Sequence, residues 1–226
     1  MKTWFWTPLL VAMVLCVTLP SVTLAAGGNT EAVLALHIGV QVAKNACGTA
    51  LPSSCGGYTT STIDSGFFNL YLTVSHSDSV GVAGVQFGID YDGANGAGCD
   101  VSSWRSCADL EFQGTGWPGD YTGNLVTWDF GDNCQLGEDV GGLAPVLVGV
   151  FEVITYSGDT FSIIPRPVDG LAKVADCTAA ENDLTGNVPS ALGTVTFGAG
   201  TGYNPCSAPV PVARTTWGSI KTLYEN

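Results

Sequence analysis

The chain has 226 residues, of which 46% are hydrophobic, only 12% are charged and 30 are glycine. This composition is too apolar for a disordered chain and too rich in glycine for a helical bundle, so it favours an all-β globular domain. Acidic residues outnumber basic ones 20 to 7, for a formal net charge of -13. Because Lys and Arg carry binding to phosphate backbones and anionic lipids, this charge excludes nucleic acid and peripheral membrane partners.

Residues 1–26 have the features of a secretory signal peptide. A lysine supplies the positive start, residues 8–19 form an apolar run, and small residues precede a cleavage position at Ala26 or Gly27. The apolar run is shorter than the roughly 20 residues that span a bilayer, so cleavage is favoured over anchoring. We therefore expect the mature chain to be secreted or held at the cell surface, without spanning a membrane.

Seven cysteines remain once Cys16 is removed with the signal peptide. In an exported protein they predict disulfides, since their spacing supports neither a zinc site nor attached haem. Pairing along the chain predicts three loop-closing bonds: Cys47–Cys55, Cys107–Cys134 and Cys177–Cys206. Cys99 is then unpaired; its alternative partner is Cys107, and a leftover thiol can also link two chains.

Strand patterns recur after the signal peptide. Apolar residues alternate with others in 67–74, 85–91 and 126–130, and again at Phe161 and Ile163. Residues 144–155 are apolar nearly throughout, which predicts a central strand covered on both faces. Four shorter candidates bring the total to about nine strands: 32–40, 108–112, 171–176 and 191–198.

Turns rich in Gly, Asn, Asp and Ser separate these strands, and no helical stripe of useful length lies between them. Short strands joined by turns are typical of two packed antiparallel sheets. We therefore predict one disulfide-stabilised β-sandwich domain over residues 27–206.

The character of the chain changes in residues 207–226. Residues 208–212 alternate proline with alanine and valine, which predicts a stiff extended spacer. Thr215 and Thr216 can then cap a short helix that carries apolar side chains on one side: Trp217, Ile220 and Leu223 or Tyr224. This helix either docks back on the sandwich or is an attachment tag; the segment resembles the C-terminal tails of uncharacterised exported bacterial proteins.

Residues 81–92, with the sequence GVAGVQFGIDYD, form an apolar strand that ends in a Tyr-Asp turn. This segment resembles a strand of cohesin-like and related carbohydrate-binding sandwiches. The resemblance implies a cohesin-like or Ig-like fold. It transfers no functional residue.

The turn after this strand is a candidate cation site, because calcium prefers several oxygen ligands from a tight loop. Its candidate ligands are Asp90, Asp92, Asn95 and Asp100. An EF-hand is excluded, since Ala94 replaces a ligand and Val101 stands at the closing position. Two interpretations stay open: a looser calcium-binding loop, or a polar turn whose carboxylates cap backbone amides. Calcium is the one cofactor that the sequence suggests.

A glycine-rich loop carries the candidate ligand-binding residues Trp117, Asp120 and Tyr121. Exposed aromatic rings can stack on sugars while a carboxylate bonds hydroxyls. The alternative is that these rings fold over a sheet edge or a disulfide. Trp128 alternates within a strand and is expected in the core, whereas the place of Trp104 stays open.

No catalytic residues are expected. Ser75, His76 and Asp78 are too close along a strand to assemble a relay, so His76 is interpreted as a turn residue. His37 either faces solvent or sits in a satisfied pocket. A glycoside hydrolase, which needs two opposed carboxylates, is the remote alternative.

The leading functional hypothesis is therefore a non-catalytic binding module, with a glycan or a surface protein as its ligand. The competing hypothesis is a structural subunit of an extracellular coat or filament that assembles with itself. Low charge and exposed sheet edges would allow neighbouring copies to add strands to one another.

Overall fold

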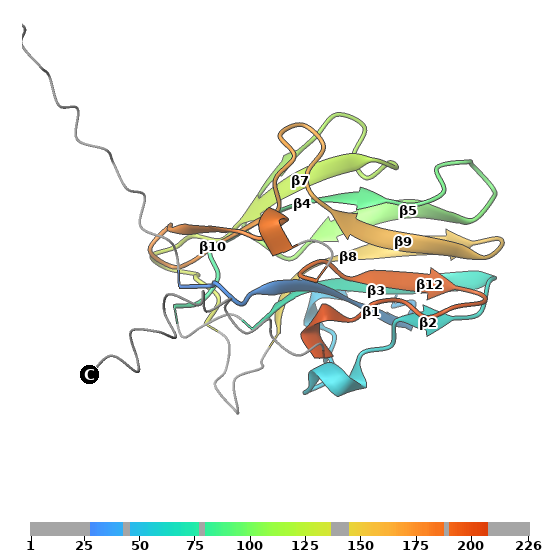
Figure 1. Ribbon diagram of the computed structural model, residues 1–226, viewed down its shortest axis with the longest axis horizontal. Helices are drawn as coiled ribbons and strands as arrows, with labels where there is room; N and C mark the ends of the chain where they lie inside the picture. Colours follow the sequence, from blue (N-terminus) through green and yellow to red (C-terminus); the bar gives the residue numbers. More distant parts are fainter. Residues whose placement is uncertain (1–27, 43–45, 77–79, 137–144, 188–189, 208–226) are drawn as a thin grey trace, which may run out of the picture.

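The computed structural model describes residues 28–42, 46–76, 80–136, 145–187 and 190–207, which form two β-sheets packed face to face (Figure 1). The predicted signal peptide and C-terminal helix lie outside these residues. Within the described ranges, no helix is long and apolar enough to cross a membrane. The all-β sandwich that the sequence predicts is confirmed.

The first sheet has four antiparallel strands in the order β1-β3-β8-β5. Leu36 and its cross-strand partner Leu72 point into the core and are fully buried, as the period of two requires. The central strand β8 is buried along most of its length, as its continuous apolar run predicts. The bounds are β1 (Val33–Val40), β3 (Gly66–Ser75), β5 (Cys99–Ser106) and β8 (Val146–Thr155).

The second sheet is built around β4 (Gly84–Asp90). One side of β4 pairs with β7, which pairs in turn with β6. On its other side, the first half of β4 pairs with β10, which is followed by β11, and the second half pairs with β9, which is followed by β12 and β2. The bounds are β2 (Ser61–Thr62), β6 (Leu110–Gln113), β7 (Thr122–Thr127), β9 (Asp159–Ile164), β10 (Lys173–Ala175), β11 (Glu181–Asp183) and β12 (Thr194–Phe197).

Aromatic rings fill the core between the sheets. The Phe151 ring lies 4.3 Å from the Trp104 ring and 5.1 Å from the Phe161 ring, measured between centroids. A Cβ on Gly149 would overlap the Trp104 ring, so glycine is needed where β5 packs beside β8. Trp104 is partly buried and packs against the core, whereas Trp128 is buried in the core as predicted.

All nine predicted strand segments overlap observed strands, and the structure adds β2, β5 and β11. Strand β5 was not predicted, because its three serines, one arginine and one aspartate interrupt the alternation of apolar and polar residues. The conformation of β5 is determined by its pairing with the apolar strand β8 and not by its own composition.

The disulfides differ from the predicted pairing of sequence neighbours. Cys47 is bonded to Cys107, so neither predicted bond that used these residues forms. The reason is that the 3-10 turn at Ala46–Gly48 packs on β5 and β8, next to the residue that follows β5. Cys99 is free, as predicted, and it is buried.

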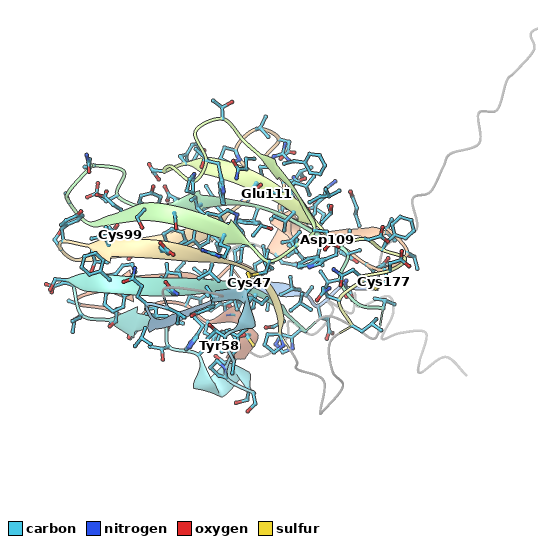
Figure 2. All side chains as sticks on the ribbon, turned by 180° about the vertical axis from the view of Figure 1, so that it is seen from behind. Cys47, Tyr58, Cys99, Asp109, Glu111 and Cys177 are labelled. Carbon is cyan, nitrogen blue, oxygen red and sulfur yellow. A yellow bond between two sulfur atoms is a disulfide. The ribbon has the colours of Figure 1, made fainter. Side chains whose placement is uncertain are left out.

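Cys134 is bonded to Cys177, and Cys206 is also in a disulfide, but not with Cys177 as predicted. Residues 134 and 177 meet because both flank the segment 80–83: Gln135 pairs with Val82, and the Cys177 amide donates to the Val80 carbonyl at 3.1 Å. Gly81 lies between them with a φ of 70°, and a Cβ there would meet the Cys177 sulfur. Figure 2 shows Cys99 and Cys177 at opposite ends of the sandwich.

Candidate functional site

The predicted calcium turn is held by hydrogen bonds within itself. Asp92 Oδ1 accepts from the Ala94 amide at 3.1 Å, and Asp100 Oδ2 accepts from the Gly96 amide at 3.0 Å. Among the described His, Cys, Asp and Glu residues, no group of three is placed to hold a metal ion. These hydrogen bonds agree with the turn-capping interpretation, and calcium binding by Asp90, Asp92, Asn95 and Asp100 stays a prediction.

The free thiol of Cys99 lies beside this turn. Asp159 Oδ2 accepts hydrogen bonds from the amides of Asp92 and Cys99 at 3.1 and 3.0 Å. Burial raises the pKa of the Cys99 thiol, and Asp159 raises it further. Burial and the negative charge of Asp120 likewise raise the pKa of Asp90. A buried thiol whose pKa is raised is a poor nucleophile.

The predicted ligand-binding loop does not present its residues as one set. The Trp117 ring packs on Phe87 and Trp104, with ring centroids 5.5 Å apart in both cases, and its Nε1 is buried without a hydrogen-bond partner. Trp117 is thus a packing residue rather than a sugar-stacking platform, a correction to the prediction. Asp120 Oδ1 accepts from the Tyr91 amide at 2.9 Å, and Tyr121 is 65% exposed.

The two histidines make structural contacts. His37 Nδ1 accepts from the Thr59 amide at 3.0 Å, and burial lowers the pKa of His37. His76 has a φ of 55°, which agrees with the predicted turn, and its Nε2 lies 2.8 Å from the Cys206 carbonyl oxygen. His37 therefore sits in the satisfied pocket that the sequence left as one alternative.

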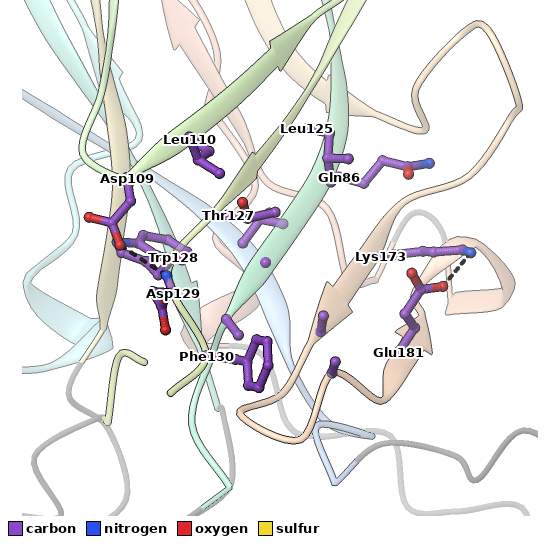
Figure 3. A pocket seen from close by; sticks show the side chains of 15 residues that line it. Gln86, Asp109, Leu110, Leu125, Thr127, Trp128, Asp129, Phe130, Lys173 and Glu181 are labelled. Carbon is purple, nitrogen blue, oxygen red and sulfur yellow. Dashed lines mark hydrogen bonds and ion pairs between the residues drawn. The ribbon is translucent and has the colours of Figure 1, made fainter. Parts of the chain in front are cut away.

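A groove of about 590 Å³ lies on the outer face of the second sheet, over β4, β6, β7 and β10 (Figure 3). The strand register explains its shape. One row across the sheet places Gly84 between Ala175 and Thr127, and these small residues form a depressed floor. Leu110 and Phe130 line the sides and are 61% and 63% exposed. The groove is therefore apolar and open to solvent.

One wall of the groove is a loop that Asp109 holds in place. The Asp109 carboxylate accepts hydrogen bonds from the Asp129 amide at 2.9 Å and from Asn133 Nδ2 at 2.8 Å. These hydrogen bonds lower the pKa of Asp109. Asp129 Oδ1 in turn accepts from the Gly131 amide at 2.8 Å. The wall that carries Phe130 is thus held by carboxylate-to-amide bonds.

The opposite wall is formed by β10 and β11. Lys173 Nζ lies 2.7 Å from Glu181 Oε2, and this ion pair is drawn in Figure 3. The turn between the strands is held by Asp176, whose Oδ1 accepts from the Thr178 and Ala180 amides at 2.8 and 3.1 Å. The Cys134–Cys177 bond joins this wall to the loop that follows Phe130.

Strand β6 is turned opposite to the usual arrangement. Leu110 and Phe112 face solvent, whereas Glu111 between them is half-buried. Glu111 Oε1 accepts from Trp104 Nε1 at 2.7 Å and from Asn124 Nδ2. An apolar pair that faces water while a carboxylate faces inward is characteristic of a surface that binds a ligand or another protein segment.

Sequence reasoning placed a strand at 108–112 but assigned no function to it. Alternation alone does not say which of its two faces is buried, because the pattern Asp-Leu-Glu-Phe-Gln fits either orientation. The acidic residue between two large apolar ones was the signal available. Only the positions of Trp104 and Asn124 show that it points inward.

No family model matches the sequence, and no curated protein matches it either. The structure is similar to a cohesin module from a family 33 glycoside hydrolase of Clostridium perfringens. The two chains are 11% identical, the match covers 74% of this chain and 96% of that chain, and the TM-score is 0.40. It is also similar to the sixth cohesin of Acetivibrio cellulolyticus scaffoldin B, which was solved in complex with a Cel5 dockerin. Here the identity is 12%, the match covers 66% of this chain and 90% of that chain, and the TM-score is 0.39. Both of these structures are cohesin modules, the class of sandwich that residues 81–92 resemble in sequence.

Proposed function

We propose that this chain is an exported, non-catalytic module that binds a protein segment in the groove over β4, β6, β7 and β10. The observation that carries the proposal is the outward face of β6, where Leu110 and Phe112 are 61% and 56% exposed beside an apolar hollow. Burial of such side chains against a partner removes apolar surface from water, at about 25 cal/mol per Å².

A protein ligand fits this groove better than a glycan. Sugar binding relies on exposed aromatic planes flanked by free polar groups. Trp117, the ring predicted to stack on a sugar, packs on core rings outside the groove, and within the groove the carboxylates of Asp109 and Asp129 accept hydrogen bonds from nearby amides. Leu110 and Leu125 offer aliphatic surface instead, which suits apolar side chains of a partner.

A second candidate, self-assembly into a coat or filament, is favoured by the open edge of β6. Among the described residues, β6 pairs with β7 alone, so its other edge can accept a strand from a neighbouring copy. Size-exclusion chromatography and electron microscopy separate the two candidates, because a subunit assembles as its concentration rises whereas a binding module stays monomeric.

The proposal is tested by photo-crosslinking on the mature chain. A benzoyl-phenylalanine is placed at position 110 or, as the control, at Ile63, which is 66% exposed outside the groove. Each protein is exposed to the extracellular fraction of the source cells, and the adducts are identified by mass spectrometry.

We expect position 110 to capture one defined protein that position 63 does not, and Gly84→Leu, which fills the floor, to reduce that capture. The proposal fails if both positions give the same adducts, or if a glycan array binds the chain and Gly84→Leu leaves the protein adduct unchanged.

A further inference from the structure

The groove has no cover within the described part of the chain. Leu110 and Phe112 on β6 and Phe130 in the loop after β7 all remain more than half exposed. Isolated apolar side chains are common on protein surfaces, but a continuous apolar hollow is a surface that another segment covers.

We propose that residues 208–226 of this same chain dock in the groove and cover it while no partner is bound. The inference deepens the proposed function, because it names a competitor for the same site. Three observations support this occupant: the chain can reach the groove, its charge is complementary, and its apolar side chains match the hollow.

The reach follows from the point where the described chain ends. The Cys206 carbonyl oxygen lies 2.8 Å from His76 Nε2. Ala83, which lines the groove, is only seven residues after His76, so these two residues are at most about 25 Å apart. Trp217 is eleven residues beyond Cys206 and, when the chain is extended, reaches up to about 36 Å from it.

Charge favours the same pairing. Asp109, Asp129 and Glu181 line the groove, and its one cation, Lys173, is already paired with Glu181. Residues 208–226 hold Arg214 and Lys221, two of the seven basic residues of the chain, and a single acidic residue. In a chain of net charge -13, this segment has more basic than acidic residues, which favours its attraction to the acidic rim of the groove.

The apolar residues of the segment also need a partner surface. Trp217, Ile220 and Leu223 recur at a spacing of three, which places them on one side of a helix. A helix this short is not stable alone in water and depends on burial of that side. An amphipathic helix in an apolar groove is a common way for proteins to recognise a segment.

The test measures amide hydrogen exchange of the full mature chain. We expect the amides of β6, β7 and residues 128–131 to exchange at least about tenfold faster in the double variant Trp217→Ala, Ile220→Ala than in the parent. Thr222→Ala, a matched change on the opposite side of the predicted helix, should leave exchange unchanged. A synthetic peptide of residues 208–226 should restore protection in the double variant, and less so when salt screens the charges.

The groove is tested in parallel. Leu110→Asp should raise exchange at residues 128–131 as the double variant does, whereas Ile63→Asp should not. The proposal is overturned if the parent and the double variant exchange alike. It is also overturned if protection depends on protein concentration, since the segment then docks on a second copy.

Failure of this inference is distinguishable from failure of the proposed function. When the crosslinking at position 110 is repeated in the double variant, partner capture should increase, because the competing segment no longer fills the groove. If protection by the segment is found and no partner is captured in either protein, the inference stands and the proposed partner does not. If capture occurs equally in both, the partner stands and the competition is refuted.

Discussion

Glu111 turns its carboxylate toward the interior of the sandwich, and this single orientation decides which side chains of β6 meet water. Its Oε1 accepts from Trp104 Nε1 and Asn124 Nδ2, so two polar groups near the core depend on one acceptor. Because Asn124 is fully buried, water cannot replace Glu111 as its hydrogen-bond acceptor. The exposure of Leu110 and Phe112 follows from it.

We therefore expect Glu111→Ala to lower the free energy of unfolding by about 1–3 kcal/mol, because it leaves buried donors without an acceptor. Glu111→Gln keeps one carbonyl oxygen and should cost less. Urea denaturation measures both changes, and Gln113→Ala, at an exposed position of the same strand, serves as the control. Equal losses for Glu111→Ala and Gln113→Ala would show that the inward bonds do not matter.

His37 gives the fold a dependence on pH. Its Nδ1 can accept from the Thr59 amide only while the ring is neutral, and burial lowers its pKa below the ordinary 6.5. A histidine whose pKa is lowered by folding stabilises the fold fully above the unfolded value, and that stability is lost as the pH falls through the folded value.

We expect the melting temperature of the mature chain to be flat above about pH 7 and to fall below pH 6.5. In His37→Gln, whose side chain does not titrate, the fall between pH 6.5 and 5 should be smaller. Thermal unfolding followed by circular dichroism at half-unit steps measures this. Parallel profiles for the two proteins would contradict the role of His37.

At the scale of elements, two disulfides join turns and loops that are distant in the sequence. The Cys47–Cys107 bond joins the turn outside the first sheet to the end of β5, whereas the Cys134–Cys177 bond joins the two walls of the groove. Their sequence separations of 60 and 43 are similar, so chain entropy predicts a similar stabilisation from each, about 4 kcal/mol. Their effects on the groove should differ.

We expect Cys134→Ser with Cys177→Ser to lower the free energy of unfolding by about 4 kcal/mol and to increase hydrogen exchange in residues 129–135 and in β10 and β11. The matched double variant, Cys47→Ser with Cys107→Ser, should be destabilised similarly while exchange around the groove stays as in the parent. If both pairs loosen the groove alike, the Cys134–Cys177 bond has no particular part in holding its walls.

At the scale of the whole molecule, three features of the sandwich lie in separate regions. The aromatic core joins the sheets through Phe151 and Trp104, the acidic turns around Cys99 close one end, and the groove occupies the outer face of the second sheet. Figure 2 shows Cys99 far from Asp109, which holds one wall of the groove. A change in the turns near Cys99 can therefore alter stability without touching the groove.

The sequence by itself determined the all-β class, the approximate place of nine strands and the burial of β8. These depend on local quantities, namely a period of two, a continuous apolar run and the position of turn residues. The unpaired state of Cys99 was also predicted. The export of the chain and the role of its C-terminal segment stay predictions, because they concern residues outside the described ranges.

Only the tertiary structure decided the partners of Cys47 and Cys134, the inward packing of Trp117 and the orientation of Glu111. Each depends on which segments meet after the two sheets close, and strand pairing joins residues that are far apart along the chain. Alternation shows that a strand has two faces, but the neighbouring strands determine which face is covered. The groove follows from that choice, and for this reason the sequence pointed to the loop around Trp117 rather than to β6.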